Sequence, residues 1–200
     1  MKNAPERFNA NYYRRYYLNP PTRSTNPSAA GRLAAFIAAY TRHLGVRPRR
    51  ILDIGCGLGW TLSGLEREFP SARCVGVEYS PYLCGKHGWQ SGSVVDFRAP
   101  RPFDLVVCND VLPSLDDRAC TAAIANLGAL TRSVLFVGAL TEEDWAQCDK
   151  RRTDPNVFLR PVRWYRRRFE REVVNLGGGL FAKRDAPIVH CALDCLGSPT

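Results

Sequence analysis

The fold is decided by one stretch of the sequence, Ile51-Leu52-Asp53-Ile54-Gly55-Cys56-Gly57-Leu58-Gly59. Its apolar first half predicts a buried strand over residues 50–54, and the pattern that follows predicts a helix over 61–68. The sharp reversal between them requires glycine, because absent side chains let a ligand lie against the backbone beside the helix N-terminus. The stretch therefore predicts the start of a β-α-β unit with a ligand site where its first strand ends.

Strand and helix patterns alternate along the rest of the chain. The predicted strands are 50–54, 74–78, 93–97, 103–108 and 133–137, and the predicted helices are 28–44, 61–68, 81–86, 116–130, 141–148 and 161–170. Two further apolar runs, 172–181 and 188–193, predict a closing antiparallel pair. Repeated β-α-β units favour a parallel sheet covered on both faces, so these seven strands predict an α/β fold with a mostly parallel sheet.

Length and composition are those of a single globular domain. Of the 200 residues, 45% are hydrophobic and 24% are charged, which is enough apolar surface for one sizeable core. No apolar stretch approaches the roughly 20 residues that a membrane-spanning helix needs, and the N-terminus does not resemble a signal peptide. We therefore expect a cytoplasmic protein with no membrane partner. The eight cysteines are scattered, which argues against a disulfide framework.

The chain is strongly basic, with a formal net charge of +9 and an isoelectric point near 9.4. Such a charge favours association with nucleic acid or another anionic partner. Only four of the 28 basic residues are lysine, however, and genome base composition can produce that bias without selection for phosphate binding. Nucleic acid is therefore a less favoured partner. The densest basic cluster is expected on the solvated face of the 161–170 helix and comprises Arg163, Arg166, Arg167, Arg168 and Arg171.

The glycine-rich turn differs from that of a nicotinamide-binding protein in two respects. Its glycines are spaced Gly-x-Gly-x-Gly rather than Gly-x-Gly-x-x-Gly, and Asp53 stands inside the strand just before them. A carboxylate at that point can receive the ammonium group of a methionine tail, whereas it would repel a pyrophosphate. The stretch therefore favours an adenosyl ligand with an amino-acid tail over a dinucleotide.

Two later strand ends supply residues that suit an adenosine moiety. Glu78, at the end of the 74–78 strand, can accept hydrogen bonds from both ribose hydroxyls, and Tyr79 beside it can cover one face of an adenine. Asp96 and Phe97 end the predicted 93–97 strand. An acid there can accept a hydrogen bond from the adenine amino group, and an aromatic ring can pack on the base. Any one of these residues alone would more often serve a turn or a helix cap.

The ordered motifs ILDIGCGLG, VGVEYS, SVVDF and FDLVVCNDVL over residues 51–112 resemble those of class I S-adenosylmethionine-dependent methyltransferases, within a similarity that covers residues 30–140. The resemblance implies a Rossmann-like three-layer sandwich with a seven-stranded, mostly parallel sheet and a C-terminal antiparallel pair. It also implies S-adenosyl-L-methionine as cofactor and a small-molecule methyl acceptor. The implied cofactor-binding residues are Asp53, Gly55, Gly57, Gly59, Glu78, Tyr79, Asp96, Phe97 and Asn109. One departure is Ser93, which stands where many members carry an acid.

The acceptor side of the site is less defined. Methyl transfer from a sulfonium needs alignment and desolvation, and a base helps only where the acceptor has a proton to lose. The place for such a base lies beyond the fourth strand, where Asp110 is the candidate catalytic residue, although an acid there can equally cap the next helix. No Asn-Pro-Pro-Tyr motif follows that strand, which makes methylation of a nucleic acid a less favoured hypothesis.

We expect no metal site. His87 is predicted in a surface loop, and His190, Cys191 and Cys195 lack the second pair of ligands that a zinc site requires.

The chain divides into a tyrosine-rich arm over residues 1–27, which is a candidate lid, and a methyltransferase domain over 28–200. The alternatives to a small-molecule enzyme are an RNA or protein methyltransferase and a non-catalytic cofactor-binding protein. A nicotinamide dehydrogenase is disfavoured by Asp53 and by the glycine spacing.

Overall fold

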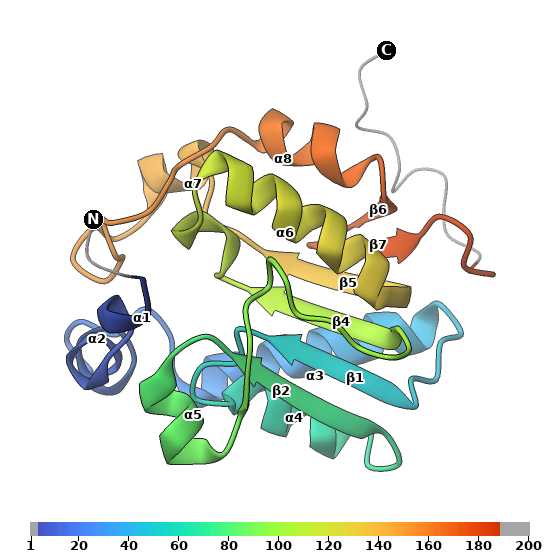
Figure 1. Ribbon diagram of the computed structural model, residues 1–200, viewed down its shortest axis with the longest axis horizontal. Coiled ribbons are helices and arrows are strands. Elements are labelled where there is room, and N and C mark those ends of the chain that lie inside the picture. The colour runs from blue at the N-terminus through green and yellow to red at the C-terminus, as the bar shows by residue number, and fades with distance from the viewer. Residues whose placement is uncertain (1–3, 189–200) are drawn as a thin grey trace.

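The computed structural model describes residues 4–188, which form a sheet with helices on both faces (Figure 1). The strands are β1 (Arg50–Ile54), β2 (Arg73–Glu78), β3 (Gln90–Ser91), β4 (Phe103–Asn109), β5 (Thr131–Gly138), β6 (Val173–Gly177) and β7 (Leu180–Lys183). Their order is β3-β2-β1-β4-β5-β7-β6. Strands β1 to β5 run parallel, and β7 pairs antiparallel with both β5 and β6. The predicted fold class is confirmed.

Two layers of helices cover the sheet. The helices are α1 (Ala4–Arg7), α2 (Ala10–Tyr13), α3 (Pro27–His43), α4 (Trp60–Glu68), α5 (Pro81–His87), α6 (Asp117–Leu130), α7 (Glu142–Gln147) and α8 (Val162–Phe169), with a π-helix at Arg14–Leu18 and a 3₁₀ turn at Leu112–Ser114. Ile37 of α3 and Leu65 of α4 belong to one buried cluster, while Ile124 of α6 and Phe169 of α8 belong to the other. Helices α3 and α4 therefore cover one face, and α6 and α8 cover the other.

Alternation along the central strands explains why both faces are buried. Ile51 in β1 and Leu105 in β4 join the cluster under α3 and α4, whereas the next residues, Leu52 and Val106, join the cluster under α6 and α8. All four side chains are fully buried. A strand buried on both faces reads as a continuous apolar run, and β1 and β4 could be recognised from sequence for that reason.

The predicted strand over residues 93–97 is wrong, because the strand paired with β2 is the short β3 and residues 94–96 form a turn. The Ser93 hydroxyl accepts a hydrogen bond from the Val95 backbone amide at 3.2 Å, and the Ser93 carbonyl accepts one from the Phe97 amide at 2.8 Å. The buried Asn126 amide of α6 donates to the carbonyls of Val94 and Phe97. These bonds satisfy the backbone locally, so the segment does not continue the sheet.

The closing antiparallel pair exists, but both of its strands begin within the first of the two predicted runs. The chain reverses within residues 177–179, where three consecutive glycines have φ of 84°, 60° and 79°. Only glycine adopts such angles readily, so this triplet sets the position of the hairpin. The second predicted run, 188–193, lies outside the described residues except for Ile188.

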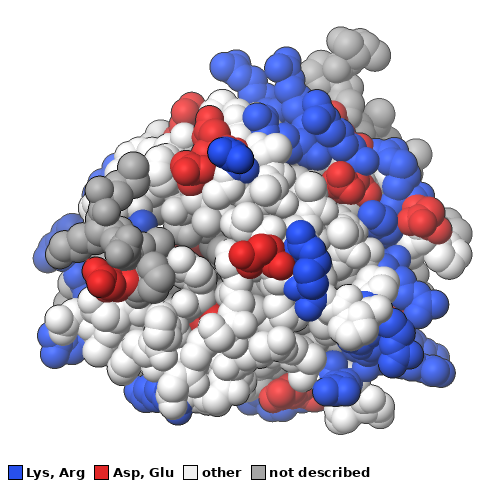
Figure 2. All heavy atoms as spheres, viewed as in Figure 1, with Lys and Arg blue, Asp and Glu red and all other residues white. Residues whose placement is uncertain are grey.

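Positive charge gathers away from the edge of the sheet where the parallel strands end. Figure 2 shows Lys and Arg side chains over α8 and along the edge where these strands begin. Arg49, Arg101 and Arg132 line a groove at that second edge. The predicted solvated face of α8 is confirmed for its exposed members, Arg163, Arg166, Arg167 and Arg171. Arg168 is half-buried and packs its guanidinium on the Trp164 ring. No described helix is long and apolar enough to cross a membrane.

One buried arginine holds the 148–161 segment, which joins α7 to α8, against the loop that follows β4. Only 3% of Arg160 is exposed, and its guanidinium pairs with Asp117 at 2.8 Å. It also donates to the carbonyls of Leu112, Leu115 and Phe158. Several acceptors from separate segments thus depend on one side chain.

We expect Arg160→Ala to lower the free energy of unfolding by about 2 kcal/mol, because it leaves carbonyl groups without a donor. Chemical denaturation measures this loss. The matched control is Arg152→Ala on the same segment, where the ion pair with Asp149 is exposed on both sides and the change should stay near 0.5 kcal/mol or below. Equal losses of unfolding free energy in the two variants would contradict the role of Arg160 in holding the 148–161 segment against the loop after β4.

Candidate active site

Two adjoining cavities lie where the parallel strands end. The larger measures about 320 Å³ and is lined by residues from the ends of β2 and β4, the loop after β3, the N-terminal arm and the 148–161 segment. The smaller measures about 90 Å³ and extends toward Asp53 and α3. Gly55, Gly57, Tyr17 and Asn109 line both cavities. Together they form one site that runs from β1 past the glycine turn to the loop after β4.

The glycine turn between β1 and α4 leaves no room for side chains at two of its positions. Gly55, Gly57 and Gly59 all have positive φ. A Cβ on Gly55 would lie 2.2 Å from Val111, and one on Gly59 would lie 2.5 Å from Trp89. Of the three glycines predicted to bind the cofactor, Gly55 and Gly57 line both cavities, whereas Gly59 lines neither and packs against Trp89.

Two side chains form hydrogen bonds with the backbone amide and the carbonyl of Gly57. Oε2 of Glu78 accepts a hydrogen bond from the Gly57 amide at 2.7 Å, and Nε1 of Trp89 donates to the Gly57 carbonyl at 3.0 Å. The other Glu78 oxygen accepts from the amides of Tyr79 and Ser80, and the side chain is buried. Trp89 was missed at the sequence level, since nothing in the local pattern marks a tryptophan that reaches across to another loop.

Asp53 is a buried carboxylate that accepts no hydrogen bond from the described residues. Only 3% of it is exposed, and no described residue donates a hydrogen bond to its side chain. Burial, together with the nearby Glu78 carboxylate, raises the pKa of Asp53 to about 7. A buried acid without a partner is unfavourable unless a ligand supplies positive charge or donors. The site therefore fits the ammonium group of an amino-acid tail.

Asp110 is held in a strained conformation at the wall of the larger cavity. Its φ of 60° is the only positive value at a non-glycine position in the described chain, and its amide donates to the Gly138 carbonyl at 2.8 Å. The cap of α6 is Asp116, whose carboxylate accepts from the Ala119 amide. Asp110 therefore does not cap that helix. The side chain is accessible from the cavity, and desolvation with a contribution from Asp154 raises its pKa to about 6.

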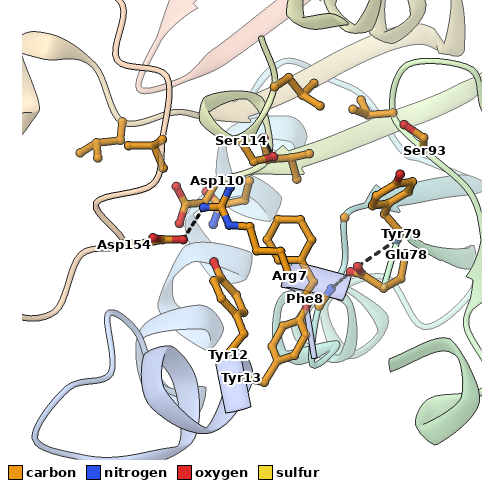
Figure 3. A pocket seen from close by; sticks show the side chains of 18 of the residues that line it. Arg7, Phe8, Tyr12, Tyr13, Glu78, Tyr79, Ser93, Asp110, Ser114 and Asp154 are labelled. Atoms are coloured by element: carbon orange, nitrogen blue, oxygen red, sulfur yellow. Dashed lines mark hydrogen bonds and ion pairs between the residues drawn. The ribbon is translucent and has the colours of Figure 1, made fainter. Parts of the chain in front are cut away.

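Two segments from opposite ends of the chain cover the cavity, and an ion pair joins them. Figure 3 shows Arg7 of the arm extending toward Asp154 of the 148–161 segment, and their side chains lie 2.5 Å apart. Phe8, Tyr12 and Tyr13 of the arm face the same space (Figure 3). Ser80 fixes the arm to β2 by donating to the Phe8 carbonyl. The tyrosine pattern indicated the arm, but no local signal marked Arg7 or Asp154.

Several predicted residues lie elsewhere. Asp96 is exposed on the turn after β3, and Phe97 is buried in the core, and neither lines either of these two cavities. Ser93, Val94 and Val95 line the larger cavity in their place. Tyr79 and Asn109 also line the larger cavity.

The histidines and cysteines named as non-ligands are only partly described. His87 is exposed and stacks on Trp89, with ring centroids 5.7 Å apart. Within residues 4–188, no three His, Cys, Asp or Glu side chains gather as a metal site would require. His190, Cys191 and Cys195 lie outside the described residues.

Known proteins share this sequence pattern. A sequence profile described as a methyltransferase domain matches residues 24–170. A ubiquinone biosynthesis O-methyltransferase from Xylella fastidiosa strain 9a5c is 32% identical over 83 residues, which cover 35% of this chain and 33% of the relative. This chain thus spans about a third of the length of the curated relatives that it matches.

Solved structures share the fold at low sequence identity. Magnesium protoporphyrin IX methyltransferase from Synechocystis PCC 6803, solved with bound S-adenosylhomocysteine, is 14% identical with a TM-score of 0.66, covering 90% of this chain and 98% of that one. The amino pentose methyltransferase CalS10 from Micromonospora echinaspora is 18% identical with a TM-score of 0.60, covering 78% and 91% respectively. Since the profile match covers well over half of the residues, this chain belongs to the methyltransferase domain family.

Proposed function

We propose that this protein methylates a small molecule held in the larger cavity, with the methyl donor lying along the glycine turn. The observation that carries the proposal is Asp53, a buried carboxylate that lacks a donor and adjoins the cavity bounded by Glu78 and Asp110. In this arrangement Asp53 binds the ammonium group of the donor, Glu78 binds its ribose hydroxyls, and Tyr79 packs on its adenine. Gly55, Gly57 and Asn109 provide the surface between them. Asp96 and Phe97 have no part in it.

The methyl donor, once bound, supplies a methyl group on a positively charged sulfur. The protein's part is to exclude water and to align an acceptor with that methyl group. Asp110 is our candidate for the residue that takes a proton from the acceptor, because its side chain reaches the cavity and does not serve as a helix cap. Its raised pKa, about 6, keeps it mainly ionised at neutral pH and able to take a proton.

The shape of the site supports a small acceptor rather than a polynucleotide. The arm and the 148–161 segment border the cavity on two sides and are tied together by Arg7 and Asp154. The exposed arginines of α8 and those near Arg49 lie over other parts of the surface (Figure 2). The similar enzymes named above are, by name, methyltransferases of an amino pentose and of magnesium protoporphyrin IX. A polymer bound along the basic surfaces would therefore lie away from this cavity.

The arm over residues 1–27 acts in this proposal as a lid. It contributes Arg7, Phe8, Tyr12, Tyr13 and Tyr17 to the cavity wall, and the family profile begins only at residue 24. Donor exchange then requires the arm to move, which breaks the Arg7–Asp154 ion pair.

The first test is calorimetric titration with S-adenosylhomocysteine, the product that keeps the amino-acid tail of the donor. We expect Asp53→Asn to weaken binding by about tenfold or more, because an amide does not offset the charge of the ammonium group. The control is Asp185→Asn, which changes an exposed acid beside the opposite edge of the sheet and should bind as the unmodified protein does. Undiminished binding by Asp53→Asn, or no binding by the unmodified protein, would refute the proposed donor site.

The lid has its own test in the rate of product release. Arg7→Ala should accelerate dissociation of S-adenosylhomocysteine by about fivefold, since it removes a partly buried ion pair that closes the cavity. Stopped-flow displacement measures the rate. Arg14→Ala serves as the control, because Arg14 is an exposed arm residue that bonds only within the arm, to Asn11. Identical release rates in all three proteins would show that the arm is a fixed wall.

A further inference from the structure

Building on the proposed function, we propose that the acceptor is an amine whose protonated nitrogen binds between the Asp110 carboxylate and the aromatic rings of the arm. Two separate features of the wall of the larger cavity indicate this class of acceptor. One is the balance of charge around Asp110, and the other is the aromatic surface opposite it.

The charge of the cavity wall is negative on the acceptor side. The wall contains one basic side chain, Arg7, and three acidic side chains, Glu78, Asp110 and Asp154. Glu78 already accepts three backbone hydrogen bonds, and Arg7 is paired with Asp154 at 2.5 Å. Asp110 accepts no hydrogen bond from a described side chain or backbone group. One carboxylate is therefore left to face the acceptor, and it selects for positive charge.

Aromatic rings line the same space. Tyr12 lies 5.0 Å from Phe8, 5.3 Å from Tyr13 and 6.3 Å from Tyr17 between ring centroids, and all four residues contribute to the wall. Aromatic faces bind ammonium and methylated ammonium groups through their quadrupoles, and they do so best away from water. A carboxylate combined with such rings suits a cation better than a neutral alcohol or a carboxylate.

The protonation states around Asp110 agree with this assignment. Burial raises the pKa values of Tyr12 and Tyr17, and the negative charge of Asp110 contributes to both shifts, so neither hydroxyl ionises at neutral pH. Asp154 is the other acid that faces Asp110, and Arg7 is the cation that pairs with it. A phenolate acceptor would have to form beside these two carboxylates, which disfavours it.

The groups in the cavity account for every proton and electron pair in methyl transfer to an amine. Asp110 accepts one proton from the bound ammonium, which frees the nitrogen lone pair. That lone pair forms the new N–C bond as the S–C bond of the methyl donor breaks and its electron pair stays on sulfur. The positive charge moves from sulfur to the methylated nitrogen, which lies beside the aromatic rings. The proton on Asp110 then leaves to solvent.

The experiment uses three probes that share a hydroxyphenyl ring and differ in the charged or neutral group at the end of the side chain. Tyramine carries an ammonium group, tyrosol a hydroxyl and 4-hydroxyphenylacetate a carboxylate. Each is titrated into the protein saturated with S-adenosylhomocysteine. We expect tyramine to bind about tenfold or more tightly than tyrosol, and 4-hydroxyphenylacetate to bind most weakly. Asp110→Asn should bring tyramine and tyrosol within about threefold of each other, and Asp185→Asn should leave the order unchanged.

Asparagine tolerates the left-handed backbone conformation of position 110, so the Asp110→Asn variant should fold. The amine assignment is overturned if tyrosol or 4-hydroxyphenylacetate binds as tightly as tyramine. It is also overturned if tyramine does not bind at millimolar concentration, or if Asp110→Asn keeps the preference for tyramine. S-adenosylhomocysteine binding separates the two proposals, because failure at that first stage refutes the donor site itself.

Discussion

The site depends on two carboxylates that the parallel pairing of β1 and β2 buries side by side. Asp53 precedes Ile54, which pairs with Val77, and Glu78 follows Val77 directly. Glu78 is satisfied by amides of the glycine turn and of its own loop, so it fixes the shape of that turn. Asp53 has no such donors and stays costly until a ligand supplies one. Glu78 thus shapes the turn and also lines the cavity, whereas Asp53 has no donor until a ligand binds.

The proposed donor half and the proposed acceptor half of the site have different structural origins. The donor half is built from the ends of β1, β2 and β4, where the sheet fixes backbone positions. The acceptor half is built from the arm, Asp110 and the 148–161 segment, which hold together through side chains such as Arg7 and Arg160. The profile match begins at residue 24, so it includes the donor half and leaves out most of the arm. Divergence of the acceptor half can change the substrate without disturbing donor binding.

Local patterns were enough to predict the central strands and the glycine turn, because both follow from apolar runs and from glycine geometry near Asp53. They failed at Ser93, where a side-chain turn and the distant Asn126 satisfy the backbone in place of a strand. They also failed to find the Arg7–Asp154 pair, whose members are separated by 147 positions in the sequence. Contacts of that kind depend on the folded path of loops, which periodicity does not encode.

The most direct measurement of the central claim is the number of protons released when S-adenosylhomocysteine binds at pH 7, obtained by calorimetry in buffers of different ionisation enthalpy. An ammonium group placed against Asp53 should lower the pKa of that acid from about 7, so about half a proton should leave on binding. The Asp53→Asn variant should release none. Binding of S-adenosylhomocysteine by the unmodified protein without proton release would contradict the role assigned to Asp53.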